Sequence, residues 1–133
     1  MAFVLDASVA AVWAFADEAS PLADLALERF HTESAFVPPL WWYEVRNILI
    51  GNERRKRITP DESTFFLQTL RQYPIRIDWS DEEGMILQLA RQYRLTFYDA
   101  AYLAVAKRNR LPMATLDNEL IRAAHDCGVS LLA

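Results

Sequence analysis

Several residue types are scarce in this sequence, and each scarcity excludes a class of protein. The single cysteine, Cys127, rules out an intramolecular disulfide and favours a reducing compartment. The three glycines form no glycine-rich phosphate loop, which argues against binding of a nucleoside triphosphate. With one cysteine and two histidines, no pair of these residues has the spacing of a zinc site.

The sequence also lacks a hydrophobic run long enough to cross a bilayer. Its most apolar N-terminal stretch, residues 7–16, follows Asp6 and has no basic segment before it, unlike a signal peptide. We therefore expect a cytoplasmic protein that does not associate with a membrane.

What remains is typical of one globular domain. The chain has 133 residues, of which 53% are hydrophobic and 24% charged, so it contains enough apolar material for a core and too much for disorder. No internal repeat, low-complexity segment or hinge divides it. We expect a single domain over residues 1–133.

The net charge of −4 argues against a generic nucleic-acid binder. The basic residues are nevertheless gathered in two runs, residues 54–57 and 107–110. These runs are either solvated helix ends favoured by the helix dipole or contacts for phosphate groups. The candidates for phosphate contacts are Arg46, Arg54, Arg55, Lys56, Arg57, Lys107 and Arg108.

Short apolar runs alternate with longer amphipathic segments along the chain. The predicted strands are residues 3–5, 35–37, 75–78, 113–115 and 129–132. The predicted helices cover residues 7–16, 21–30, 40–57, 59–70, 80–93, 98–110 and 117–128. Capping boxes are expected where Thr59 precedes Glu62 and where Ser80 precedes Glu83. The alternation predicts an α/β fold, with a parallel sheet covered by helices on both faces.

Four acidic residues lie inside apolar segments or directly after them, where a charged side chain is expected to be close to the core. Each follows a predicted strand or lies near the start of a helix: Asp6, Glu44, Asp99 and Asp117. Burial penalises an ionised carboxylate. Because ligands of open α/β sheets bind at the carboxyl ends of the strands, we expect these acids to meet at that edge.

Each acid also has a purely structural interpretation. Asp6 and Asp117 are favourable helix caps, and Asp99 is a favourable first-turn acid. Ser8 is either an ordinary helix-start serine or a group that holds a metal-bound water or a phosphate. Glu44 is harder to explain structurally, because it falls on the inward stripe of its helix. Taken together, the acids favour a site for one or two Mg²⁺ or Mn²⁺ ions.

Such a site suits the hydrolysis of phosphodiester bonds, because bound divalent ions activate water and stabilise in-line attack on phosphorus. Two other acid-rich α/β chemistries fit less well. A haloacid-dehalogenase phosphatase needs a second aspartate where Ser8 stands, and a phosphorelay receiver needs a lysine suitably placed after Asp78. A phosphatase-like hydrolase of small substrates stays as an alternative.

Four segments in order, residues 5–8, 38–45, 95–104 and 114–120, resemble the motifs of PIN domains, and more narrowly those of VapC toxins from bacterial toxin–antitoxin pairs. The resemblance implies a PIN-like three-layer α/β/α sandwich with a short, mainly parallel central sheet of four to five strands. It also implies that the catalytic, metal-binding residues are Asp6, Glu44, Asp99 and Asp117. Ser8 would be a supporting polar residue, and Glu119 is an alternative to Asp117 as the fourth acid.

The activity implied by the resemblance is that of a Mg²⁺-dependent (or Mn²⁺-dependent) endoribonuclease toxin acting on structured RNA, such as tRNA or ribosomal RNA. The implied partners are a cognate antitoxin that blocks the site, the RNA substrate, and a second copy of the chain in a homodimer. The alternative is a non-catalytic PIN-like interaction module within a toxin–antitoxin regulatory complex.

Overall fold

A short parallel sheet forms the centre of the molecule. The computed structural model describes residues 1–80 and 82–133. Its four strands are β1 (Ala2–Leu5), β2 (Ser34–Val37), β3 (Ile75–Ile77) and β4 (Met113–Ala114). They are arranged in the order β3-β2-β1-β4, and every pair is parallel. The register places Phe3 beside Ala35, and Leu5 beside Ala114.

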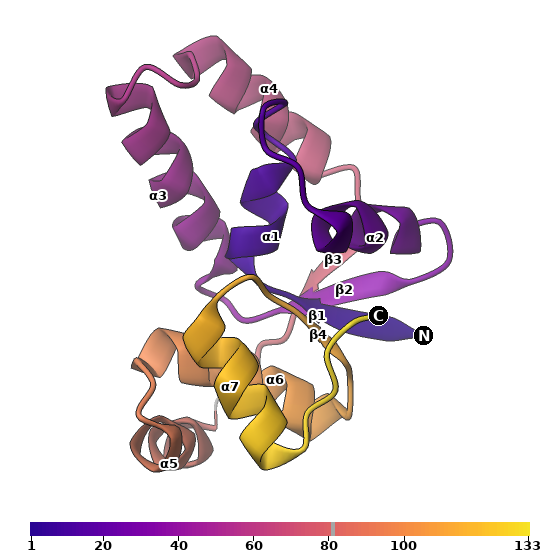
Figure 1. Ribbon diagram of the computed structural model, residues 1–133, viewed down its shortest axis with the longest axis vertical. Coiled ribbons are helices and arrows are strands. Elements are labelled where there is room, and N and C mark those ends of the chain that lie inside the picture. Colours follow the sequence, from indigo (N-terminus) through magenta and orange to yellow (C-terminus); the bar gives the residue numbers. More distant parts are fainter. Residues whose placement is uncertain (81) are drawn as a thin grey trace.

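Helices cover both faces of this sheet (Figure 1). On one side lie α1 (Ala7–Val12), α2 (Pro21–Arg29), α3 (Trp41–Arg54) and α4 (Pro60–Leu70). On the other side lie α5 (Glu83–Tyr93), α6 (Phe97–Asn109) and α7 (Asn118–Cys127). The predicted three-layer α/β/α arrangement with a parallel central sheet is therefore confirmed.

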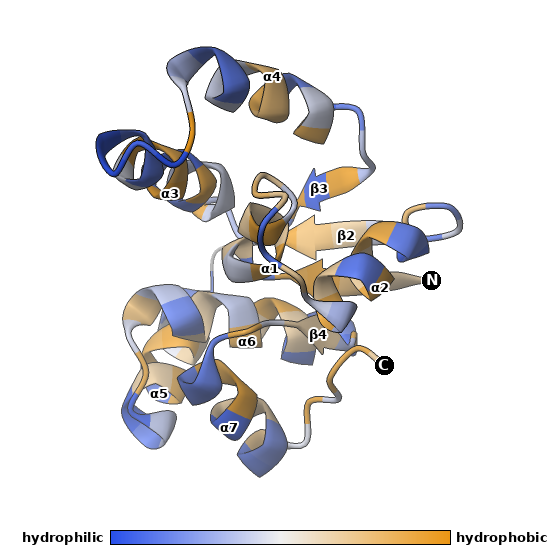
Figure 2. Cartoon of the chain, turned by 45° about the horizontal axis from the view of Figure 1, so that its top comes forward, coloured by the Kyte–Doolittle hydropathy of each residue, from blue (hydrophilic) through white to orange (hydrophobic). Residues whose placement is uncertain are grey.

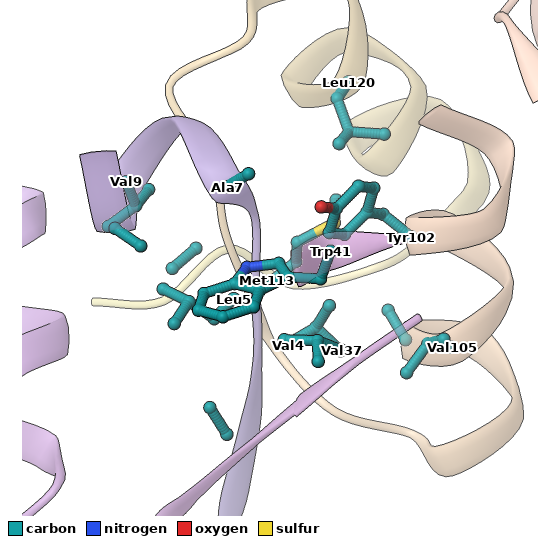
Figure 3. Close-up of a cluster of buried hydrophobic side chains, with 14 of the residues drawn as sticks. Val4, Leu5, Ala7, Val9, Val37, Trp41, Tyr102, Val105, Met113 and Leu120 are labelled. Atoms are coloured by element: carbon teal, nitrogen blue, oxygen red, sulfur yellow. The ribbon is translucent and has the colours of Figure 1, made fainter. Parts of the chain in front are cut away.

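The core lies on both sides of the sheet. The β1 residues Phe3, Val4 and Leu5 are completely buried, as expected for a central strand covered on both faces. Helix α6 is buried from Ala100 to Ala106, because its many alanines allow close packing. Figure 3 shows Val4 and Val37 of the sheet grouped with Val105 of α6. Polar residues lie on the outward faces of the helices, as the hydropathy colouring of Figure 2 shows for α4 and α7.

Several helix boundaries follow the chemistry of their ends. Thr59 and Glu62 form the predicted capping box at the start of α4. Helix α3 was expected to reach residue 57 but ends at Arg54, since Lys56 has a φ of 59°. Helices α5 and α6 are followed by Arg94 and Arg110 in the left-handed conformation, a position that glycine usually fills.

Other predicted boundaries were wrong. The helix predicted over residues 7–16 ends at Val12. The helix predicted from residue 80 begins at Glu83, and the backbone N–H of Ser80 instead donates to Asp78 Oδ1 over 2.9 Å. Asp81, inside that predicted capping box, lies outside the described residues. The strand predicted over residues 129–132 is reduced to an isolated parallel bridge between Leu131 and Met113.

The topology brings one end of several elements to the same edge. Because the strands are parallel, the carboxyl ends of β1 and β4 lie together, and α1 and α7 begin there. The N-terminus is at the opposite edge, with the C-terminus close to it (Figure 1). Within the described part of the chain, no helix is both long and apolar enough to cross a membrane.

Candidate active site

Asp6 is the most deeply buried acid of the sheet's carboxyl edge, with 6% of its surface exposed. It follows β1 directly and occupies the N-cap position of α1, although its side chain makes no capping hydrogen bond. Its Oδ2 atom instead accepts hydrogen bonds from the hydroxyls of Ser8 and Thr115, each over 2.7 Å. Burial raises the pKa of the Asp6 carboxyl; these two hydrogen bonds oppose that shift, and the charge of Asp117 adds to it.

The two hydroxyls that hold Asp6 also organise the loop after β4. Ser8 Oγ accepts a hydrogen bond from the backbone N–H of Leu116, and Thr115 Oγ1 accepts one from the backbone N–H of Asp117, both over 3.1 Å. The hydroxyl of Ser8 therefore links Asp6 to the loop after β4. Thr115 belongs to the strand predicted over residues 113–115, and the sequence gives no sign of a role in the site. Its place beside Asp6 follows from the register, one position beyond the Leu5–Ala114 pair.

Glu44 lies in the first turn of α3 and faces α6. One of its oxygens, Oε1, accepts a hydrogen bond from the hydroxyl of Tyr102, a completely buried residue of α6. Burial raises the pKa of Glu44; the Tyr102 hydrogen bond opposes this shift, whereas the charges of Asp6 and Asp99 add to it. Burial also raises the pKa of the Tyr102 phenol, so it stays a donor at neutral pH.

Sequence reasoning missed Tyr102. The available signal was its spacing, because it lies three residues after Asp99 and therefore on the same face of α6.

Asp99 lies in the first turn of α6, whose N-cap residue is Thr96. The backbone N–H of Asp99 donates to Thr96 Oγ1 over 3.1 Å, which fixes the start of the helix. Burial raises the pKa of the Asp99 side chain to about 6, with further contributions from the negative charges of Asp117 and Asp6. This carboxyl therefore holds its proton more tightly than an ordinary aspartate does.

Asp117 is the N-cap residue of α7, as its structural interpretation predicted. Its Oδ1 atom accepts hydrogen bonds from the backbone N–H groups of Glu119 and Leu120, over 2.9 and 3.1 Å. Glu119, the alternative fourth acid, forms an ion pair with Arg122 over 2.7 Å. The charge of Asp117 raises the pKa of both Asp6 and Asp99, whereas that of Glu119 raises the pKa of Asp99.

The structure thus brings the acids of four separate elements into electrostatic contact. Asp6 and Asp99 each raise the pKa of Glu44, and Asp117 raises that of Asp6 and Asp99. Within residues 1–80 and 82–133, none of these four carboxylates forms an ion pair with lysine, arginine or histidine. An uncompensated cluster of negative charge is the arrangement that a bound cation would stabilise.

The chemistry of this donor set fits a hard divalent cation. The donors are carboxylate and hydroxyl oxygens, the ligands that Mg²⁺ and Mn²⁺ prefer over sulfur and nitrogen. In the described part of the chain, no three His, Cys, Asp or Glu side chains are close enough to form a preassembled metal cluster. Mg²⁺ needs only one or two carboxylates and keeps several waters, so a looser acidic site accommodates it.

Two of the basic residues expected to contact phosphate are engaged elsewhere. Arg108 is largely buried and pairs with Asp78 over 2.7 Å, while Arg57 pairs with Asp17 over 3.3 Å. Arg46, two residues after Glu44, is exposed, and its guanidinium carbon lies 5.8 Å from the centre of the Tyr43 ring. Arg46 is therefore an exposed basic side chain held against aromatic rings of its own helix, α3.

The fold and the order of these residues define a known class of protein. Residues 3–126 match the PIN domain family, so the chain belongs to that family. The family membership predicted from the four sequence segments is confirmed.

Within this family the chain is a distant homologue of VapC ribonuclease toxins. Ribonuclease VapC3 of Pyrobaculum aerophilum is 29% identical over 123 residues, which cover 90% of this chain and 92% of that protein. The crystal structure of PAE2754 from Pyrobaculum aerophilum has a TM-score of 0.71 at 25% identity, covering 92% of this chain and 87% of the other.

A more divergent protein has the same fold. The crystal structure of Mycobacterium tuberculosis VapC20, a toxin that cleaves the sarcin–ricin loop, has a TM-score of 0.63 at 14% identity. The match covers 92% of this chain and 95% of the VapC20 chain.

Proposed function

We propose that this chain is a metal-dependent endoribonuclease toxin that hydrolyses phosphodiester bonds in RNA, with tRNA or ribosomal RNA as the expected substrates. The observation that carries the proposal is the convergence of Asp6, Glu44, Asp99 and Asp117 at one edge of the sheet. The similarity to Ribonuclease VapC3 over nine-tenths of the chain supports it.

In this proposal Asp6, Glu44, Asp99 and Asp117 would hold Mg²⁺ or Mn²⁺, and a bound ion would supply an activated water and charge neutralisation at the phosphate. The protein's own contribution is to position the acids. Ser8 and Thr115 fix the rotation of the Asp6 carboxylate, and Tyr102 fixes that of Glu44. Arg46 is the proposed contact for an RNA phosphate, because it is exposed and belongs to α3, the helix that carries Glu44.

The direct test measures cleavage of total RNA by the purified chain with Mg²⁺ and with EDTA. We expect cleavage only with the metal, and we expect Asp6→Asn and Asp99→Asn each to lower its rate at least 100-fold, since each removes a ligand charge. Asp126→Asn is the matched control, because Asp126 is exposed at the other end of the α7 helix.

The alternative, a non-catalytic PIN-like module, is favoured by one observation: Asp117 already has a structural role as the cap of α7. On that alternative, EDTA and the Asp6→Asn and Asp99→Asn substitutions change nothing, and no RNA is cut. Cutting that survives EDTA or both substitutions would also refute the metal-dependent proposal.

We further propose a cognate antitoxin as protein partner. An apolar groove of about 500 Å³ between α4 and the region of α1 and α2 supports it, with Phe65, Phe66 and Leu27 in its lining. Phe65 is 70% exposed, so a partner that covers it gains apolar burial. Phe65→Asp should prevent co-purification with the antitoxin while RNA cleavage is retained.

The homodimer also stays a proposal, and light scattering of the purified chain tests it. A mass of 15.3 kDa at micromolar concentration would refute it.

A further inference from the structure

A groove at Glu44 continues into a second hollow lined by aromatic side chains. The groove, which we call the glutamate groove, is lined by Leu40, Tyr43, Glu44, Asn47 and Tyr98. The second hollow, the aromatic pocket, has a volume of about 450 Å³, and its lining includes Leu40, Trp79, Phe97, Tyr98, Ile86 and Arg108. Leu40 and Tyr98 belong to both linings, so the two form one continuous depression that begins at an acid of the candidate active site.

The aromatic side chains along this depression are unusually exposed. Tyr43 is 74% exposed, Trp79 73% and Tyr98 61%. Large aromatic side chains normally contribute their apolar area to a core. An exposed group of them beside a charged site marks a surface on which a ligand is bound. These exposed side chains contribute little to the packing of the core, so we ask which ligand they contact.

Arg108, the cation in the lining of the aromatic pocket, is already paired, because its guanidinium lies 3.5 Å from Glu82 and also contacts Asp78. Asp78 and Arg108 both line the pocket, and they pair with each other over 2.7 Å. A phosphate would find no free charge in this pair, whereas a neutral planar group would find aromatic faces together with the polar atoms of Ser80. A nucleobase has flat apolar faces and a polar edge, so it matches the lining of this pocket.

From this geometry we propose that the aromatic pocket binds one unpaired base of the RNA, stacked against Trp79 and Tyr98, next to the phosphate held at the acidic site. This inference rests on the proposed ribonuclease function and specifies the form of its substrate. Stacking on aromatic side chains is the common way in which proteins hold single-stranded bases. The continuity through Tyr98 favours RNA as occupant, because the strand that supplies the phosphate also supplies the neighbouring base.

The pocket predicts that the cleaved bond lies in a loop or another unpaired stretch. A base in a duplex is stacked on its neighbours and is not free to enter a side pocket. Structured RNA would therefore be cut at its single-stranded parts.

The test measures binding without cleavage, so that it is independent of catalysis. A short single-stranded RNA with 2-aminopurine at one position is titrated with the Asp99→Asn variant in EDTA, which also reduces repulsion of the phosphates. We expect the fluorescence to be quenched by stacking at one particular position. Trp79→Leu and Tyr98→Leu should each weaken binding roughly tenfold and relieve the quenching. Trp79→Phe and Tyr98→Phe should preserve both, because they keep an aromatic ring.

Phe65→Leu is the matched control, since Phe65 is as exposed as Trp79 but lies in the α4 groove. Unchanged binding and quenching in both leucine variants, an equal loss with Phe65→Leu, or no RNA binding at all would overturn the proposal. If Trp79→Leu instead dissociates a dimer and leaves RNA affinity unchanged, the pocket is an interface between copies and the proposal is wrong. Cleavage by the unmodified chain with Mg²⁺ is scored separately, so loss of the base pocket does not count against the nuclease function.

Discussion

The hydroxyl of Tyr102 donates a hydrogen bond to Glu44, and this contact joins helices α6 and α3 across the acidic site. The tyrosine is completely buried, whereas the glutamate is partly exposed to the groove. Tyr102 is therefore a positioning residue, which acts on the reaction through Glu44.

The substitution Tyr102→Phe tests this relationship. Removing the hydroxyl takes away the hydrogen bond that opposes the raised pKa of Glu44, so that pKa should rise further. We expect the acidic limb of the pH–rate profile to move to higher pH, the cleavage rate at neutral pH to fall about tenfold, and stability to fall by about 1 kcal/mol. A rate loss with an unchanged pH profile would contradict a role through Glu44.

A second prediction concerns the pH dependence of stability. Burial and neighbouring charges raise the pKa of Asp99 from 3.8 to about 6. The folded protein therefore binds this proton more tightly than the unfolded chain, and metal-free stability should fall as the pH rises from about 4 to about 6. The difference in unfolding free energy between Asp99→Asn and the unmodified chain should grow across this window by about 1–2 kcal/mol, allowing for solvent screening of a half-exposed group.

Urea denaturation in EDTA at pH 4, 5, 6 and 7 measures this difference. Asp126→Asn, at the exposed end of α7, provides the baseline. A difference that shrinks as the pH rises would have the wrong sign and would refute the electrostatic account of the site.

A third prediction concerns the ion pair of Asp78 and Arg108 in the lining of the aromatic pocket. Burial alone would raise the pKa of Asp78, but hydrogen bonds from Arg108, Ser80 and Asn109 lower it to about 2. Because the folded-state pKa is depressed, the stabilisation is fully present above the ordinary value of 3.8 and is lost as the pH falls through about 2. Asp78→Asn should cost roughly 1–3 kcal/mol at pH 7 in urea denaturation and much less at pH 2. An equal cost at both pH values would show that packing, not charge, stabilises this contact.

A fourth prediction follows from the scarcity of glycine. Arg94 follows α5 with a φ of 55°, a left-handed conformation that glycine adopts more readily. Arg94→Gly should therefore stabilise the fold by about 0.5–1 kcal/mol. The matched control is Arg91→Gly, an exposed position inside the same helix, which should destabilise it by about 1 kcal/mol. The midpoint of urea unfolding distinguishes the two, and a loss of stability with Arg94→Gly would contradict the backbone argument.

The alternation of short apolar runs with longer helical segments was sufficient to predict a parallel sheet covered by helices. Boundaries were predicted less well wherever a contact distant in sequence decides them. Residues 129–132 have the composition of a strand, yet only Leu131 pairs with β4, which is itself two residues long. Ser80 resembles a helix cap, but its N–H belongs to the turn after Asp78.

The site could be predicted in part for a similar reason. Charged residues in apolar surroundings stand out in a sequence, so the pattern alone was enough to propose the four acids. Thr115 and Tyr102 are neutral residues in segments where threonine and tyrosine are unremarkable, and their contribution depends on partners that only the fold brings close. Arg108 was expected to contact phosphate because it belongs to a basic run. In the structure its charge is already paired with Asp78.

The hydrogen bond from Thr115 to Asp6 spans 109 residues of the chain. A nascent polypeptide that ends before residue 113 lacks the Thr115 partner of Asp6 and lacks Asp117, so it cannot assemble the cluster. A chain with the proposed activity is therefore harmless to the ribosome that synthesises it until translation is nearly complete. Premature termination before residue 113 should leave a product without toxicity.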